Sequence, residues 1–316
     1  MHKVIFDTDP GVDDAMALLF LERHPDIDLI GITTAFGNAS IETTTRNALY
    51  LKQQWNIAAP VAKGSAEQFE PSRHTHPFPA HIHGDDGLGN IGVPDIVDVP
   101  LDPRPAHQFI IDTVKAHPGE ITLVAVGRMT NLANALKAAP EIAGLVKEVI
   151  IMGGAVDVPG NINPAAEANI HGDPEAADYI MIAPWKVVVV GLDVTLKTTM
   201  SRTELAELSG KGGAPMKLLD RLSQFYIDFY DGEVKDSMVV HDTCACVYLV
   251  ARELFTTRGG PVRVLTTGIG EGKTIQKPDG HRFGPSVWDN APSQLVCTDI
   301  EADAVMTLVK ETLVRQ

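Results

Sequence analysis

"KVIFDTDPGVDDAMALLFLERH" (residues 3–24) places an apolar strand, a turn and a helix in direct succession. Residues 3–6 form a short apolar run typical of a buried strand, and residues 13–24 have the composition of a helix. Between them Pro10 and Gly11 predict a turn. A strand followed at once by a helix is the repeating unit of α/β proteins.

The same order recurs along the chain. Further apolar, strand-like runs stand at 27–35, 120–127, 148–154 and 185–194. Strands that are apolar on both faces predict a largely parallel sheet with helices on both faces. We therefore expect an α/β fold with an open, mostly parallel sheet that is mixed at its edge. Residues 1–316 read as one domain, with loop insertions at about 64–106 and 201–240.

The charge balance excludes some partners. The 316 residues include 26 Lys and Arg against 41 Asp and Glu, a formal net charge of -15. Nucleic acid and anionic membranes both require a basic face, so neither is an expected partner. No window has the length of apolar sequence that a membrane span needs, and no secretory signal is visible. With only three cysteines, all expected to be reduced, the chain is predicted to be cytoplasmic.

The opening stretch crowds four carboxylates, those of Asp7, Asp9, Asp13 and Asp14, into eight residues. Like charges this close raise each other's pKa unless a cation lies among them or water solvates them. Carboxylate oxygens suit Ca²⁺ or Mg²⁺ better than zinc. Two alternatives stay open: aspartates at a helix start also cap it, and the D-x-D pattern occurs in phosphatases, with Asp7 as nucleophile.

Polar residues follow several predicted strands. In open α/β sheets ligands bind outside the carboxyl ends of the strands, so these residues are expected to meet at one rim. They are Asp7, Asp9, Asn38, Gly127, Asn131, Met152 and Asp193.

Two further motifs carry polar groups suited to chemistry. His241 and Asp242 open an apolar, helix-like run, either as a cap with a packed histidine or as an imidazole and a carboxylate facing a site. The loop at 159–178 holds Asn161, Asn163, Glu167 and Asn169, which suit vicinal hydroxyls, although Asn163 could equally mark a turn.

His83 precedes a glycine-rich turn, and we favour a pocket-lining or catalytic role for it over metal ligation. The chain has no GxGxxG or Walker-type phosphate loop, so nucleotide phosphates are poorly provided for.

Taken together, these motifs resemble the nucleoside hydrolases, specifically the inosine–uridine-preferring type. The resemblance spans nearly the whole chain. It is carried by "DTDPGVDDAMAL" (7–18), "TTAFGN" (33–38), "HGDDGLGN" (83–90), "VGRMTNLA" (126–133), "IMGGAV" (151–156), "GNINPAAEANIHGDPEAA" (160–177) and "HDTCACV" (241–247).

The resemblance implies a tightly bound Ca²⁺ at the strand ends and a ribonucleoside substrate. The implied calcium ligands are Asp9, Asp14, the backbone carbonyl of Val126, and Asp242. The implied substrate-binding residues are Asp13, Asn38, His83, Met152, Asn161, Glu167, Asn169, Tyr226 and Tyr230. Of these, Met152 is expected under the sugar, and Tyr226 and Tyr230 belong to an insertion that closes over the base.

The implied reaction is calcium-dependent hydrolysis of the N-glycosidic bond of ribonucleosides to ribose and free nucleobase. A metal-bound water is the expected nucleophile, Asp9 the general base and His241 the acid that protonates the leaving base. Carboxylates would stabilise the positive charge that develops on the ribose. Nucleoside catabolism and salvage, and assembly into homotetramers or dimers, are further expectations.

Two residues depart from the family pattern. Arg128 stands where a small residue or proline is commoner, and Ala168 stands where a bulky residue is expected, which predicts a looser wall near the ribose 5′ side. Two rival functions are a D-x-D phosphatase and a non-catalytic, calcium-dependent nucleoside-binding module.

Overall fold

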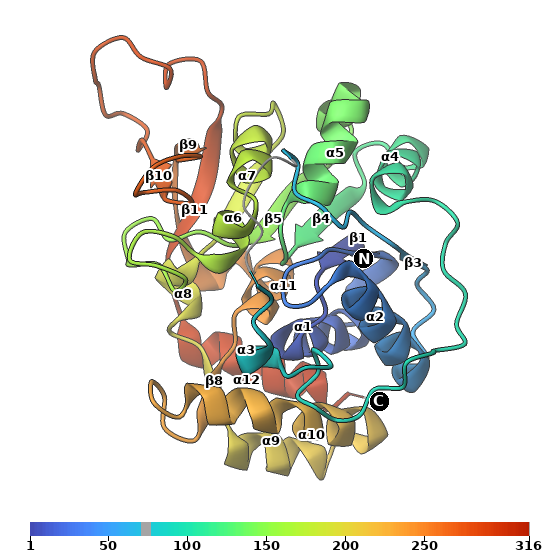
Figure 1. Cartoon of the computed structure of the whole chain (residues 1–316). Coiled ribbons are helices and arrows are strands. Elements are labelled where there is room, and N and C mark those ends of the chain that lie inside the picture. Colours follow the sequence, from blue (N-terminus) through green and yellow to red (C-terminus); the bar gives the residue numbers. More distant parts are fainter. Residues whose placement is uncertain (71–76, 316) are drawn as a thin grey trace.

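The computed structural model describes residues 1–70 and 77–315, and a nine-stranded sheet runs through it in the order β10-β9-β11-β6-β5-β4-β1-β2-β3 (Figure 1). The strands are β1 (His2–Thr8), β2 (Ile27–Thr34), β3 (Val61–Ala62), β4 (Ile121–Ala125), β5 (Glu148–Met152), β6 (Val187–Val190), β9 (Phe255–Val264), β10 (Thr274–Gln276) and β11 (Ser293–Ile300).

The sheet is parallel from β3 through β1 and β6 to β11, and antiparallel only where β9 pairs with β11 and β10 pairs with β9. This confirms the predicted mostly parallel sheet with a mixed edge. Consecutive residues of each central strand enter opposite cores: Val4 and Phe6 pack on one side of β1, and Ile5 packs on the other. Both faces are therefore apolar, which is why these strands read as unbroken apolar runs.

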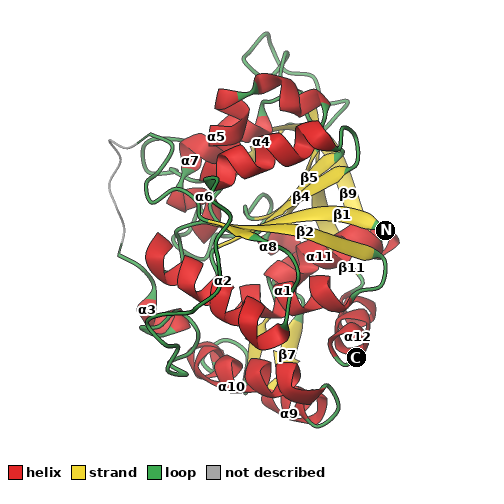
Figure 2. Ribbon diagram, turned by 90° about the vertical axis from the view of Figure 1, so that its right-hand side faces the viewer, coloured by secondary structure: helices red, strands yellow, loops and turns green. Residues whose placement is uncertain are grey.

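Helices cover both faces of the sheet, as Figure 2 shows from the side. One layer contains α4, α5 and α7, and the other contains α1, α2, α10, α11 and α12. Their bounds are α1 (Val12–Arg23), α2 (Ile41–Trp55), α4 (Ala106–Ala116), α5 (Thr130–Ala138), α7 (Pro174–Met181), α10 (Gly213–Tyr230), α11 (Asp242–Val250) and α12 (Ala302–Leu313). The shorter helices are α3 (Ala80–His83), α6 (Ala168–Gly172), α8 (Leu192–Thr195) and α9 (Arg202–Ser209), with 3₁₀ turns at Pro140–Gly144 and Arg252–Leu254.

Helix α1 is buried along nearly its whole length, from Val12 to Leu21. It contacts β2 on one side and α10, α11 and α12 on others. A helix with neighbours all round carries apolar residues all round rather than a single stripe. The aspartates at its first turn are consequently held inside the protein, next to the carboxyl end of β1.

The two predicted insertions lie beside that end of the sheet. Residues 71–76 of the first insertion lie outside the described residues, and its described part contributes α3. In the second, the antiparallel pair β7 (Thr199–Ser201) and β8 (Ser237–Val239) brackets α9 and α10. This pairing closes the insertion at its base and places α10 against α3 and α1.

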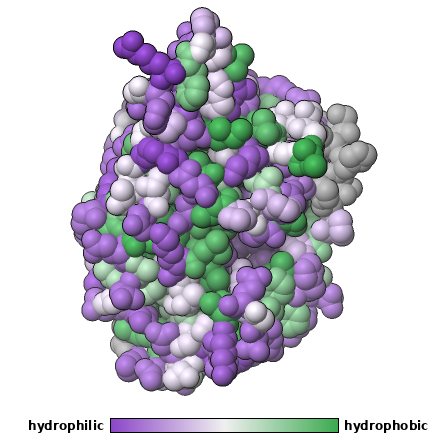
Figure 3. Space-filling view, turned by 90° about the vertical axis from the view of Figure 1, so that its left-hand side faces the viewer, coloured by the Kyte–Doolittle hydropathy of each residue, from purple (hydrophilic) through white to green (hydrophobic). Residues whose placement is uncertain are grey.

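The loop between β10 and β11 projects from the sheet, at the upper left of Figure 1. It exposes Phe283 and Val287, and polar and apolar side chains are interspersed over the face of the molecule seen in Figure 3. Among the described residues, no helix combines the length and the apolar character that crossing a bilayer requires. The three cysteines are free and buried.

The core position of β1 gives a stability prediction. Phe6→Ala removes a ring that is fully buried, so the free energy of unfolding is expected to fall by about 3–5 kcal/mol. Phe283→Ala is the matched control, because that ring is 67% exposed and its loss is expected to change stability by less than about 0.5 kcal/mol. Chemical denaturation of both variants measures the difference, and equal losses would contradict the assigned core.

Candidate active site

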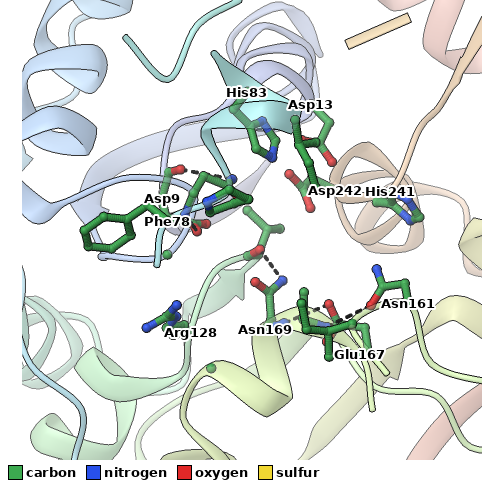
Figure 4. A pocket seen from close by; sticks show the side chains of 18 of the residues that line it. Asp9, Asp13, Phe78, His83, Arg128, Asn161, Glu167, Asn169, His241 and Asp242 are labelled. Atoms are coloured by element: carbon green, nitrogen blue, oxygen red, sulfur yellow. Dashed lines mark hydrogen bonds between the residues drawn. The ribbon is translucent and has the colours of Figure 1, made fainter. Parts of the chain in front are cut away.

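A cavity of about 710 Å³ opens beyond the carboxyl ends of the central strands. Its lining draws on segments from both ends of the chain, and Figure 4 shows several of these side chains pointing into one space. The predicted site residues that line it are Asp9, Asp13, Asn38, His83, Val126, Met152, Asn161, Glu167, Asn169, Tyr226, Tyr230, His241 and Asp242. Asp14 is bonded to Asn38 of this lining, and of the residues predicted to meet at the rim of the sheet, Asp9, Asn38 and Met152 line the cavity.

Asp9 follows β1 immediately and is buried. Its Oδ2 accepts the backbone N–H of Asn38 at 2.7 Å, whereas its Oδ1 is buried and has no hydrogen-bond partner among the residues that the structure describes. A Cβ at Gly37 would lie 2.0 Å from Oδ2, and one at Gly127 would lie 2.5 Å from Oδ1, so both positions require glycine. Burial, with repulsion from Asp14, raises the pKa of Asp9 well above its usual value.

Asp14 joins β1, α1 and the loop after β2. It accepts hydrogen bonds from the Thr8 hydroxyl, the Gly11 N–H and the Asn38 side-chain amide. The Gly11 bond satisfies a free N–H at the start of α1, so the capping role considered for this residue is confirmed. Asn38 thus holds two of the acidic residues, Asp9 and Asp14, in place.

Asp13, Asp14 and Asp242 form a buried group in which one carboxylate oxygen of each residue lies within 4.8 Å of those of the other two. Asp242 comes from the first turn of α11, far along the chain from α1. Burial and the neighbouring Asp14 raise the pKa of Asp13 to about 8, and burial with the surrounding carboxylates raises the pKa of Asp242 well above its usual value. Three buried carboxylates that lie this close together are the kind of oxygen donor set that Ca²⁺ or Mg²⁺ binds, so these residues fit the expected calcium.

Imidazole and phenol groups line the cavity beside this acidic group (Figure 4). His241 Nε2 lies 3.0 Å from the Tyr230 hydroxyl, and its Nδ1 lies 2.9 Å from the Thr195 hydroxyl. The His83 ring stacks on Tyr226 at 5.2 Å between centroids. Burial lowers the pKa of His241 to about 4 and that of His83 to about 3, so both rings are neutral at pH 7 in the free protein.

The loop between β5 and α7 supplies the amide-rich part of the lining. Glu167 caps α6, accepting the N–H groups of Asn169 and Ile170, and it also accepts that of Gly154. The Asn169 amide donates to the carbonyl of Val126 at 2.7 Å. Asn161 Oδ1 accepts the Ala168 N–H. These bonds fix the loop against the ends of β4 and β5.

Three polar residues at the rim serve the scaffold. Asp7 Oδ1 accepts hydrogen bonds from Thr33 and Asn131, and Asp193 accepts the N–H groups of Val156 and Asp157. The three rim residues, Asp7, Asn131 and Asp193, do not line the cavity. Asn163 accepts the N–H groups of residues 165 and 166, which confirms the turn alternative for it.

The sequence reasoning missed several lining residues, namely Phe78, His81, Ile162 and Phe229. Phe229 lies three residues after Tyr226 on α10, a spacing that places both on one helix face, and this signal could have found it. Phe78 stands between two prolines in the first insertion, where no periodicity marks it. Arg128, which had no assigned task, also lines the cavity.

Comparison with known proteins places this site in context. The family model described as inosine-uridine preferring nucleoside hydrolase matches residues 4–307. The probable uridine nucleosidase 1 of Oryza sativa subsp. japonica is 37% identical over 98% of this chain and 96% of its own length. The inosine-uridine preferring nucleoside hydrolase of Leishmania major is 37% identical over 85% of this chain and 86% of its own length.

Solved structures of nucleoside hydrolases have the same fold as this chain. A plant nucleoside hydrolase, PpNRh1, superposes with a TM-score of 0.95 at 37% identity, covering 100% of this chain and 99% of that one. A purine-preferring ribonucleoside hydrolase from Gardnerella vaginalis gives a TM-score of 0.90 at 32% identity, covering 99% and 98%.

The raised carboxyl pKa values predict that the stability of the metal-free protein, measured in EDTA, falls as the pH rises. Asp13 keeps its proton to about pH 8 in the folded chain but only to about 3.8 when unfolded, so its contribution to stability is lost as pH rises through that window. Asp13→Asn is therefore expected to raise the melting temperature in EDTA more at about pH 8 than at about pH 5. Calorimetric melting scans at both pH values measure this, and an equal change at both would contradict the buried acidic group.

Proposed function

The chain belongs to the inosine-uridine preferring nucleoside hydrolase family and hydrolyses the N-glycosidic bond of ribonucleosides; on this premise we propose that Asp9 is the general base and Ca²⁺ the cofactor. The observation that carries the proposal is Oδ1 of Asp9, a buried acceptor beside the cavity that has no partner within the described part of the chain. An unpaired buried oxygen is costly, so its retention supports a role in accepting a proton from an attacking water.

The cation would be held by Asp14 and Asp242, with Asp13 beside them and Asp9 and the Val126 carbonyl on the cavity side. When bound, it would neutralise the carboxylates, keep them ionised, bind the ribose diol and acidify a water. The family resemblance places Asp13 only among the substrate-binding residues. Its position beside Asp14 and Asp242 supports a second role, that of helping to hold the cation. The Asn169 amide, bonded to the Val126 carbonyl, orients that oxygen.

The carboxylates suit the charge that the reaction creates. Cleavage of an N-ribosidic bond passes through an oxocarbenium-like state with positive charge on the sugar. Asp9, Asp13, Asp242 and Glu167 all line the cavity, so the surrounding field favours that charge. Asn161 and Asn169 would hold the sugar hydroxyls, and Met152 at the end of β5 would lie under the ring.

The leaving base would be received on the imidazole side. The neutral His241 ring can donate its N–H proton to the departing base while its other nitrogen accepts one from the Tyr230 hydroxyl, and the Tyr226 and His83 rings stack on each other beside it. The relatives' names support inosine and uridine as substrates. A role in nucleoside salvage, a cytoplasmic location and assembly into dimers or tetramers stay predictions.

The residues of the cavity do not support the alternative hypothesis of a D-x-D phosphatase. Its nucleophile would be Asp7, but Asp7 is buried in bonds to Thr33 and Asn131 and does not line the cavity. A binding module without catalysis would need no general base, and membership of an enzyme family speaks against it.

Ribose release from inosine and uridine tests the function. The wild-type protein is expected to release ribose from at least one of them, and Asp9→Asn is expected to lower kcat about 10²- to 10⁴-fold while it keeps the fold. A reducing-sugar assay measures the product. Full turnover by Asp9→Asn would reject the proposed base, and no ribose from any ribonucleoside would reject the function.

Substrates with different leaving groups test whether His241 acts as the acid. His241→Ala is expected to lower kcat for inosine about 10²-fold or more, because hypoxanthine needs a proton to depart. With 4-nitrophenyl riboside, whose phenolate leaves unaided, the same variant is expected to keep most of its activity. Steady-state kinetics with both substrates decide, and equal losses would show that His241 serves another purpose.

A further inference from the structure

Lys273 lies in the turn between β9 and β10, one residue before β10 begins. Its ammonium group donates to the backbone carbonyls of Ala155 at 2.7 Å and Val156 at 3.0 Å. Hydrogen bonds from a charged donor are about twice as strong as neutral ones. Within the described part of the chain, no carboxylate forms an ion pair with Lys273, so its charge is directed at the backbone of the β5–α6 loop (residues 153–167).

The same short stretch of this loop is held from its other side. The carboxylate of Asp193 in α8 accepts the N–H groups of Val156 at 2.9 Å and Asp157 at 2.7 Å. Backbone polar groups in an irregular segment need partners, and here two side chains supply them. Asp193 and Lys273 together therefore fix the start of the β5–α6 loop.

The residues on both sides of Lys273 also pack against the loop. Gly272 has a φ of +81°, and a Cβ there would lie 2.8 Å from the Cβ of Ala166. A Cβ at Gly154 would lie 3.0 Å from the hydroxyl of Thr274. The turn before β10 is therefore in close contact with both the beginning and the end of the β5–α6 loop.

Two residues that line the cavity are connected to this arrangement. The N–H of Gly154 donates to Glu167 Oε2 at 2.9 Å. The carbonyl of Ala166 accepts the N–H of Asn161 at 3.2 Å. Glu167 and Asn161 both line the cavity, whereas Lys273 does not (Figure 4). A lysine outside the cavity thus supports the segment that carries two of its polar groups.

We propose that Lys273 is a positioning residue: by holding the β5–α6 loop, it places Glu167 and Asn161 where they contact the bound sugar. The inference rests on the proposed function, in which this loop binds the sugar hydroxyls. It also gives the antiparallel edge of the sheet a task, because β9 and β10 carry the turn that supplies the lysine.

Direct contact between Lys273 and the substrate is the weaker explanation. Lys273 does not line the cavity, and its ammonium group is already bonded to two carbonyls. A purely structural role is the second alternative, and it leads to a different result. Loss of the lysine would then lower stability without a selective effect on substrate binding.

The experiment compares Lys273→Met, Lys273→Arg and a matched control, Lys277→Met. Lys277 follows β10 on the same hairpin, and its ammonium group pairs with Asp289 at 3.2 Å, away from the β5–α6 loop. Methionine keeps most of the length of the side chain and removes its charge. Three quantities are measured for each protein: kcat and KM for the better of inosine and uridine, amide hydrogen exchange by mass spectrometry, and the melting temperature.

For Lys273→Met, KM is expected to rise about 10-fold with kcat changed less than about threefold, because the lost bonds support sugar binding and the catalytic residues stay in place. Peptides within residues 153–167 are expected to exchange their amide hydrogens at least about threefold faster, with the rest of the chain unchanged. Lys273→Arg can donate to the same carbonyls, so its KM is expected to stay within about threefold of the wild type. Lys277→Met is expected to match the wild type in KM and in exchange at residues 153–167.

An unchanged KM, or unchanged exchange at residues 153–167, in Lys273→Met overturns the proposal. Faster exchange across the whole chain, with a lower melting temperature and a lower kcat, would show a merely structural role and also overturns it. So does a failure of Lys273→Arg to restore KM. If the wild type releases no ribose from any ribonucleoside, the proposed function fails separately, and hydrogen exchange then decides alone: a change confined to residues 153–167 supports the positioning role, and any other result contradicts it.

Discussion

Mutual repulsion among buried carboxylates is the constraint on which the rest of this structure depends. Asp9, Asp13, Asp14 and Asp242 are all buried near the rim of the sheet, where burial and proximity each disfavour their charged forms. A fold tolerates such a group when it gains something from it, and here the gain is a cavity lined by carboxylate oxygens. The field suits a divalent cation and a sugar that becomes positive during reaction.

The fold supplies the means of bringing these groups together. Parallel strands end at one rim, so the turns after β1, β2, β4 and β5 meet there, and α11 adds Asp242 from late in the chain. The amides of Asn38 and Asn169 connect these segments through bonds to Asp14 and to the Val126 carbonyl. The second insertion brings α10 to the cavity, where Tyr226, Phe229 and Tyr230 supply aromatic lining. Rigid strand ends thus hold the acids, and the insertions complete the walls.

Much of this could be predicted from the sequence, for identifiable reasons. Unbroken apolar runs mark strands buried on both faces, and residues directly after them must lie at the rim, so Asp9, Asn38 and Met152 were found by position alone. Contacts that depend on packing were not predictable. Asn38 and Glu167 were expected to face a substrate, yet their polar atoms also hold the backbone and Asp14. The place of Phe78 in the cavity lining and the contact of Arg128 with the Phe36 ring depend on long-range packing, which leaves no local pattern in the sequence.

The most direct test of the central claim is the anomalous X-ray signal of crystals grown with calcium. The account predicts one ion per chain, with carboxylate oxygens of Asp9, Asp14 and Asp242 at about 2.3–2.6 Å from it. A map without an ion at saturating calcium, or with an ion that none of these three residues contacts, would contradict it.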